Sequence, residues 1–175
     1  QLIMLDPPLI NGFPSFGIHI AKLLSPKYVD KMTPAGISLY RRDHWDSRED
    51  AAKALRPKGL FSAFDQQCFD DYIRYGLTED PIRGGVTLTI PKMAEVEIFR
   101  TNPSLFWLKP RQAPSVPVKL IVGQDSLFIK RGFPQRVKRM LGIEYIVHEG
   151  GHMFPLEYPL QVARLVKQLI VEDQK

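Results

Sequence analysis

The segment from residue 116 to residue 152 alternates between strand-like and helix-like patterns, and this constrains the fold more than any other feature. The apolar run over 117–123 is rich in β-branched residues and bounded by proline and glycine, which predicts a buried strand. A basic amphipathic stretch over 133–141, closed by Gly142, predicts a surface helix. The run over 143–147 predicts a second strand. Strand, helix and strand joined by short loops form a parallel crossover unit, so we expect an α/β protein.

Two polar residues follow these two strands. Asp125 lies just beyond the first, and His152 lies beyond the second, after Glu149, Gly150 and Gly151. Because the carboxyl ends of neighbouring parallel strands meet at one edge of a sheet, we expect Asp125 and His152 to lie close together. A carboxylate in this place fixes the tautomer of an imidazole, and the imidazole exchanges a proton near neutral pH. The sequence therefore predicts a catalytic pair of Asp125 and His152.

The order strand, acid, helix, strand, histidine resembles the C-terminal end of an α/β-hydrolase. The matching residues are Leu120-Ile121-Val122-Gly123-Gln124-Asp125 and Glu149-Gly150-Gly151-His152-Met153-Phe154-Pro155. In that family the nucleophile, the acid and the histidine follow one another along the chain in this order. The resemblance implies that Asp125 is the acid, that His152 is the base and that no cofactor is needed. It also implies a partial α/β-hydrolase sheet of parallel strands with flanking helices and an inserted helical lid.

The first residues form a further strand pattern. The apolar run over 2–5 ends at Asp6, Pro7 and Pro8, and the resemblance places it directly after the helix that follows the nucleophile. The oxyanion loop and the G-x-S-x-G elbow would then precede Gln1, so we expect the N-terminal half of the same protein to be a partner of these residues. Asp6 ends a strand at the same edge as His152 and is the reserve acid. Its alternative role is to begin a proline turn.

Helical patterns predominate between residues 14 and 110, interrupted by a short extended run at 86–90. The predicted organisation is a core strand and loop over 1–13, a helical lid over 14–110 and the C-terminal part of the hydrolase core over 111–175. A lid excludes water and gives an apolar wall to a small hydrophobic substrate. The candidates for that wall are Trp45, Phe64, Met153 and Phe154.

A competing motif overlaps the histidine. The letters His148-Glu149-Gly150-Gly151-His152 match the zinc-protease pattern H-E-x-x-H, with Glu172 as a candidate third ligand. That pattern binds zinc on a helix, where positions i and i+4 share a face. Here a strand pattern leads into it, and two glycines cost a helix roughly 2 kcal/mol relative to alanine. We predict no metal site and keep a zinc hydrolase as an alternative.

Composition narrows the partners and the location. The 24 basic residues exceed the 19 acidic ones by a net charge of +5, but they are dispersed, which argues against a nucleic-acid track. No apolar run is long enough to span a membrane. The single cysteine, Cys68, excludes an internal disulfide and fits a reducing compartment. The ending Gln174-Lys175 is one leucine short of a peroxisomal signal. We expect an intracellular protein, cytoplasmic or peroxisomal, and a homodimer is one assembly open to it.

The resemblance implies hydrolysis of ester-like bonds in a small apolar or aromatic substrate, by a Ser-His-Asp triad whose serine lies upstream. An upstream aspartate nucleophile would instead imply an epoxide or haloalkane hydrolase, with Tyr40, Tyr72 and Tyr75 as candidates to polarise an epoxide oxygen. A third alternative is a non-catalytic member that only binds a hydrophobic ligand.

Overall fold

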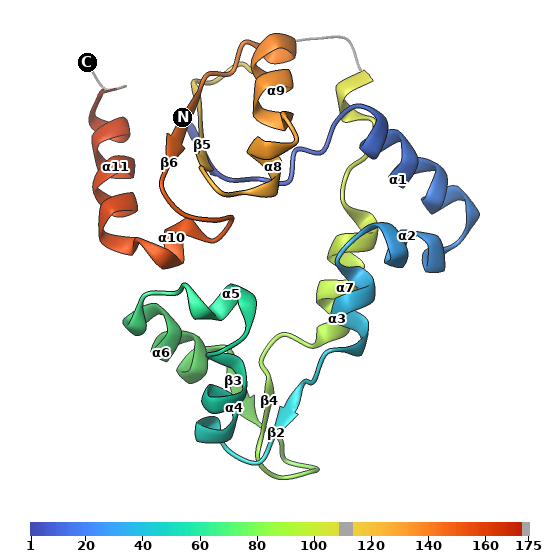
Figure 1. The fold of residues 1–175 in the computed structure, drawn as a ribbon, viewed down its shortest axis with the longest axis vertical. Helices are drawn as coiled ribbons and strands as arrows, with labels where there is room; N and C mark the ends of the chain where they lie inside the picture. Colours follow the sequence, from blue (N-terminus) through green and yellow to red (C-terminus); the bar gives the residue numbers. More distant parts are fainter. Residues whose placement is uncertain (109–113, 173–175) are drawn as a thin grey trace. The chain divides into compact units, whose positions relative to one another are not determined.

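The computed structural model describes residues 1–108 and 114–172, so the ending Gln174-Lys175, which is one leucine short of a peroxisomal signal, lies outside the described residues. The chain forms two compact units (Figure 1). The core unit contains Gln1–Gly12 and Phe106–Lys175, and the insert unit contains Phe13–Leu105. Among the described residues, no helix combines the length and the apolar character that a membrane crossing requires.

The core unit is built on a three-stranded parallel sheet in the order β1-β5-β6. Its strands are β1 (Leu2–Leu5), β5 (Val118–Gly123) and β6 (Tyr145–His148). Its helices are α8 (Leu127–Lys130), α9 (Phe133–Leu141), α10 (Phe154–Glu157), α11 (Pro159–Glu172) and the short 3-10 helix η1 (Phe106–Leu108). The predicted parallel crossover from β5 to β6 is confirmed, because Leu120 pairs with Tyr145 in parallel register.

Both faces of the central strand β5 are covered by apolar side chains. Leu120 and Val122 pack with Val137 of α9 on one face. Ile121 packs with Phe154 and Val162 on the other face, where α11 lies. Figure 1 shows α9 and α11 on opposite sides of the sheet. A strand buried on both faces needs apolar residues at every position, which is why 118–122 contains so little alternation.

Helix α9 begins and ends where the sequence predicts. Gly142 adopts a left-handed backbone (φ +68°), and its N–H donates to the carbonyl of Lys138. A residue without Cβ takes this conformation at low cost, so Gly142 ends the helix. The four-residue helix α8 was not predicted. It begins after Ser126, whose hydroxyl accepts a hydrogen bond from the N–H of Phe128 at 3.1 Å.

The insert unit is richer in helices than in strands, as predicted, but it also contains a small antiparallel sheet in the order β2-β4-β3. Its helices are α1 (Phe13–Leu24), α2 (Pro26–Met32), α3 (Ala35–Tyr40), α4 (Arg48–Leu55), α5 (Gly59–Ser62), α6 (Gln66–Tyr75) and α7 (Lys92–Thr101). Its strands are β2 (His44–Trp45), β3 (Leu77–Glu79) and β4 (Val86–Leu88). Of these strands only β4 lies in a predicted extended run, because residues 86–90 are all apolar or β-branched, whereas β2 and β3 lie in stretches without such a run.

A partly buried ion pair joins two helices of the insert unit. Arg100 of α7 donates from Nε and Nη2 to the two carboxylate oxygens of Asp30 of α2, at 2.8 and 2.7 Å. The hydrogen bonds from Arg100 hold the pKa of Asp30 below its usual value. A two-point contact of this kind fixes the relative orientation of α2 and α7, and not only their separation.

The turn between β3 and β4 is held by Asp80. Its Oδ1 accepts hydrogen bonds from the backbone N–H groups of Ile82 and Arg83, at 3.0 and 3.1 Å, and its Oδ2 accepts from Nε of Arg83 at 2.7 Å. The backbone and side-chain hydrogen bonds from Arg83 lower the pKa of the Asp80 carboxyl to about 2, from a usual value of 3.8. The turn therefore depends on an ionised carboxylate.

We expect acid to weaken this turn. Because the pKa of Asp80 is lower in the folded than in the unfolded state, its contribution is complete above about pH 4 and is lost as the pH falls toward 2. The measurement is thermal unfolding of a Trp107→Phe protein at stepped pH, followed by fluorescence of Trp45, which is buried in the same sheet. Asp80→Asn should lower the melting temperature at pH 7 and flatten its change between pH 4 and 2. Equal slopes for both proteins would contradict this assignment.

Candidate functional site

The loop after β6 carries His152, and it is fixed by the backbone that follows β5. The N–H of Gln124 donates to the carbonyl of His148 at 2.8 Å, and the N–H of Asp125 donates to the carbonyl of Gly150 at 2.9 Å. Sheet pairing thus continues for two residues beyond the ends of the strands. As a result, the loop lies over the carboxyl edge of β5, where parallel sheets place their sites.

Gly123 allows the loop that carries His152 to lie close to the end of β5. A Cβ placed on Gly123 would lie 2.1 Å from the carbonyl oxygen of Gly151, which is far inside contact distance. Gly150 itself has φ +97°, a backbone conformation that residues with a side chain rarely adopt. The glycines at the end of β5 and in the loop are therefore both required by the path of the chain.

His152 is hydrogen bonded to Asp6. The distance from Nδ1 of His152 to Oδ2 of Asp6 is 2.8 Å. The side chain of Asp6 is fully buried, whereas that of His152 is 47% exposed. An ionised carboxylate only accepts hydrogen bonds, so this contact assigns the proton of the neutral ring to Nδ1 and leaves Nε2 as the basic nitrogen. A fixed tautomer with an accessible ring is what a catalytic base requires.

The backbone of Asp6 is held in an uncommon conformation. Its φ is +42°, in the left-handed region, and its N–H donates to the carbonyl of Ile121 at 2.7 Å. Asp tolerates this region better than most residues, but the conformation still costs free energy, which the surrounding contacts must offset. The hydrogen bond to β5 fixes Asp6 directly after β1 and directs its carboxylate toward His152.

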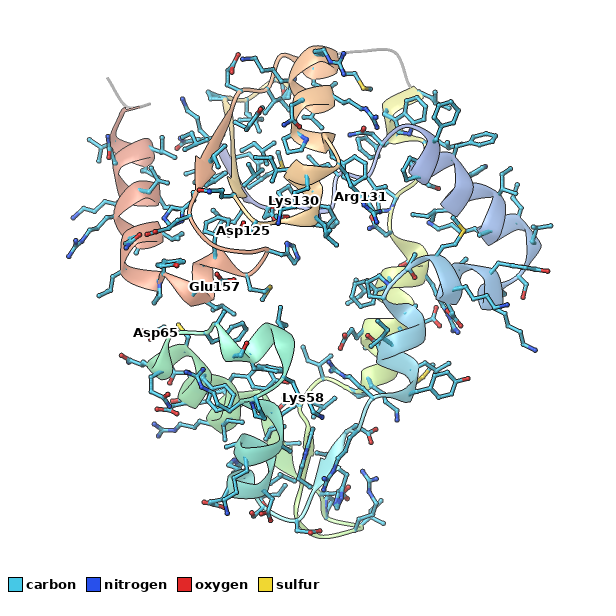
Figure 2. The ribbon with its side chains drawn as sticks, in the orientation of Figure 1. Lys58, Asp65, Asp125, Lys130, Arg131 and Glu157 are labelled. Atoms are coloured by element: carbon cyan, nitrogen blue, oxygen red, sulfur yellow. The ribbon has the colours of Figure 1, made fainter. Side chains whose placement is uncertain are left out.

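The predicted pairing of Asp125 with His152 is wrong. The Asp125 side chain is 67% exposed, and its carboxylate lies 3.7 Å from Nζ of Lys130. Figure 2 shows Asp125 and Lys130 together near α8. The neighbouring residue, Ser126, is buried and caps α8, and the turn that begins the helix carries the Asp125 carboxylate toward solvent. Asp6, the reserve acid, makes the contact instead.

A second ring contact restricts the imidazole. The ring of Phe128 in α8 meets the ring of His152 edge to face, with 5.0 Å between the ring centres and 88° between the planes. Such edge-to-face contacts stabilise a ring orientation as well as burying its surface. Phe128 was not predicted as a site residue, because nothing in the apolar pattern of 127–129 indicates a helix or the side that faces His152.

Three of the four predicted wall residues lie in hydrophobic cores. Trp45, Phe64 and Phe154 are each at most 4% exposed, so they offer no surface to a substrate. Phe154 packs with Ile121 under α11. The prediction is wrong for these three, because large aromatic side chains are more often used to fill a core. Met153 remains partly exposed next to His152.

The zinc pattern does not form a helix. His148 ends β6, and residues 149–153 form bends and turns. The His148 ring stacks on Phe154, with 5.0 Å between the ring centres, and its Nδ1 lies 2.8 Å from the carbonyl oxygen of Glu149. Glu172 ends α11, and its side chain lies outside the described structure. No cluster of three or more His, Cys, Asp or Glu suited to a metal occurs in residues 1–108 and 114–172. The zinc alternative therefore lacks its structural basis.

We expect Gly123→Ala to disturb the His152 loop. The added Cβ meets a backbone carbonyl that cannot rotate away, so the free energy of unfolding should fall by about 1–3 kcal/mol. Gly59→Ala is the matched control, since an added Cβ there meets nothing within 4 Å. Chemical denaturation measures both variants. A Gly123→Ala protein as stable as the Gly59→Ala protein would show that the loop does not press on β5.

No family model matches the chain. Among curated proteins, the chain is 23% identical over 212 residues to the abhydrolase domain-containing protein AFT2-1 of Alternaria alternata, covering 99% of this chain and 74% of that protein.

Three solved structures share the fold. E-2-(acetamidomethylene)succinate hydrolase matches with a TM-score of 0.64 and 13% identity, over 82% of this chain and 52% of its own. A peroxisomal α/β-hydrolase of Saccharomyces cerevisiae matches with a TM-score of 0.63 and 19% identity, over 98% and 46%. The thioesterase domain from the curacin biosynthetic pathway matches with a TM-score of 0.58 and 14% identity, over 87% and 62%. The chain thus spans about half the length of the first two structures.

These similarities agree with the parallel sheet and its flanking helices described above. The chain has part of the α/β-hydrolase fold.

Proposed function

We propose that the protein is a hydrolase in which His152 is the general base and Asp6 is the acid that orients it. The observation that carries this proposal is the 2.8 Å hydrogen bond between the buried Asp6 carboxylate and Nδ1 of the half-exposed His152. The Asp6 charge stabilises the imidazolium that forms when Nε2 takes up a proton. In this proposal the carboxylate of Asp125 has no catalytic role.

The proposed reaction is acyl transfer to water. Nε2 of His152 takes the proton of a serine hydroxyl supplied upstream of these residues, and the serine oxygen attacks the carbonyl carbon of an ester-like bond. The imidazolium returns the proton to the leaving group as its bond to the carbonyl carbon breaks. His152 then deprotonates a water molecule, which attacks the carbonyl carbon of the acyl-serine, and the imidazolium returns that proton to the serine oxygen as the bond between serine and the acyl group breaks, releasing the acid.

The solved structures support this proposal only in general terms. Two of them are named as a hydrolase and a thioesterase, which fits chemistry at an acyl carbon. The preference for a small apolar or aromatic substrate stays a prediction, and partly exposed Met153 beside His152 is the one predicted wall residue still available for it. The roles of the insert unit as a lid and of an N-terminal half as the source of the nucleophile are parts of the same proposal.

The epoxide alternative has less support. Tyr40 and Tyr75 are largely exposed in the insert unit, and the ring of Tyr72 packs against Phe61 with 4.9 Å between the ring centres. Burial raises the pKa of the Tyr72 phenol. No contact among the described residues distinguishes these three tyrosines as a group that would polarise an epoxide oxygen.

Mutations in the full-length protein can distinguish the roles of Asp6 and Asp125. Asp6→Asn should lower kcat by about 10³- to 10⁴-fold, because an amide no longer fixes the base tautomer. Asp125→Asn should change kcat by less than about threefold, because an exposed carboxylate paired at 3.7 Å contributes little. Ester hydrolysis measured at saturating substrate tests both variants. A large loss with Asp125→Asn and none with Asp6→Asn would reverse the assignment.

Labelling with a fluorophosphonate tests the serine mechanism. We expect the full-length wild-type protein to be labelled and His152→Ala to lose labelling, since the serine would no longer be deprotonated. The Asp125→Asn protein is the labelled control. A wild-type protein that hydrolyses its substrate but takes no label would point to a nucleophile other than serine. A wild-type protein with neither label nor hydrolysis would favour the ligand-binding alternative.

A further inference from the structure

The carboxylate of Glu157 holds the residue before His152. Glu157 is the last residue of α10, and its Oε2 accepts a hydrogen bond from the backbone N–H of Gly151 at 2.9 Å. Figure 2 shows Glu157 near the end of α10. Gly151 and Glu157 are six residues apart, so this bond closes a short loop of chain that contains His152.

The two glycines before His152 make room for this carboxylate. A Cβ added to Gly150 would lie 2.6 Å from Oε2 of Glu157, and a Cβ added to Gly151 would lie 3.0 Å from Oε1. Both carboxylate oxygens of Glu157 therefore lie next to the backbone of the loop. The pair Gly150-Gly151 has a physical purpose here, which is to admit a carboxylate next to the main chain.

The other anchors of this loop come from the main chain. The N–H of Asp125 donates to the carbonyl of Gly150, and the N–H of Phe154 donates to the carbonyl of Gly151 at 3.2 Å. Together with Glu157, these bonds fix Gly150 and Gly151 from both directions. The Glu157 bond is charge-assisted, and such bonds are shorter and stronger than those between neutral groups.

The position of the loop backbone decides the geometry at the ring. The Asp6 carboxylate is buried and fixed by its own backbone, so the 2.8 Å bond to His152 tolerates little movement of the histidine. A displacement of about 1 Å would take this distance beyond hydrogen-bond range. Misplacing a catalytic group by that amount costs on the order of 100-fold in rate.

We propose that Glu157 is a positioning residue, which holds the loop so that His152 keeps its hydrogen bond to Asp6. This inference rests on the proposed function for its kinetic consequences, but its structural part does not. Among the described residues, no hydrogen bond joins Glu157 to Asp6 or to the His152 ring; Glu157 acts through the Gly151 amide.

The experiment compares three variants of the full-length protein. Glu157→Ala removes the acceptor, whereas Glu157→Gln keeps a side-chain oxygen that can accept from Gly151 N–H. Glu144→Ala is the matched control. Glu144 is an exposed carboxylate that forms an ion pair with Lys138, and it precedes β6, at the opposite end of that strand from His148. The first readout is the proton resonance of Nδ1–H of His152, recorded on protein with ¹⁵N-labelled histidine.

We expect Glu157→Ala to lose or broaden this resonance, and Glu157→Gln and Glu144→Ala to retain it. In the hydrolysis assay, Glu157→Ala should lower kcat by about 10- to 100-fold with KM changed by less than about twofold. Glu157→Gln should recover kcat to within about threefold of wild type. A resonance and a kcat that survive Glu157→Ala would overturn the proposal, as would a Glu157→Gln protein as impaired as Glu157→Ala.

Two outcomes keep the inference separate from the proposed function and from folding. If the wild-type protein hydrolyses nothing, the proposed function fails, and the Nδ1–H resonance alone decides the role of Glu157. If Glu157→Ala does not fold, Glu157→Gln is compared with Glu157→Asp, whose side chain is one methylene shorter. Loss of the resonance in Glu157→Asp and its retention in Glu157→Gln would support positioning, and equal resonances would overturn it.

Discussion

The site depends on the close passage of one loop over the end of the central strand. Asp6 follows β1 and His152 follows β6, and these two strands lie on opposite sides of β5. The hydrogen bond between Asp6 and His152 therefore has to reach across β5. It can do so because Gly123 has no side chain, so that the carbonyl of Gly151 lies directly over it. A residue with a side chain at the end of β5 would hold the loop away, and the imidazole would no longer reach the Asp6 carboxylate.

Burial is distributed unequally between the two partners, and this division suits a base. Asp6 is buried and held by the carbonyl of Ile121 through its N–H, so its carboxylate cannot follow the histidine if the loop moves. A buried carboxylate is costly unless it is hydrogen bonded, so its contact with His152 also stabilises the fold. The exposed half of the imidazole does not need a hydrogen-bond partner within the protein. The same hydrogen bond thus stabilises the native state and selects the ring tautomer.

The strand ends could be predicted from sequence, whereas the partner of His152 could not. Apolar runs and a closing glycine located β1, β5 and α9, and parallel pairing brought Asp6, Asp125 and His152 to one edge. The direction of a carboxylate at that edge depends on the turn that follows the strand. Ser126 caps α8 and turns Asp125 outward, and a four-residue helix leaves no periodic signal. Asp125 still contributes to the site, but through its backbone N–H, which no pattern of side chains could indicate.

The roles of the aromatic residues were also not predictable from the sequence. Trp45, Phe64 and Phe154 are residue types expected in a pocket wall, but the same types fill hydrophobic cores. The structure shows that all three are buried in cores. Phe128, which does contact the imidazole, lay in a stretch with no predicted element. Strands β2 and β3 of the insert unit were not predicted, because neither lies in a longer run of apolar and β-branched residues such as the one that surrounds β4.

The accidental zinc pattern has a physical explanation in the loop. Four of the five residues of His148-Glu149-Gly150-Gly151-His152 take part in three separate contacts. His148 stacks on Phe154 at the end of β6, the two glycines leave space for Glu157, and His152 reaches Asp6. A helix would place both histidines on one face, but it would remove the Gly151 N–H from Glu157 and the Gly150 carbonyl from Asp125. The hydrogen bonds that fix the loop are therefore incompatible with the helical motif that its sequence matches, and they instead hold a histidine whose ring is hydrogen bonded to a carboxylate.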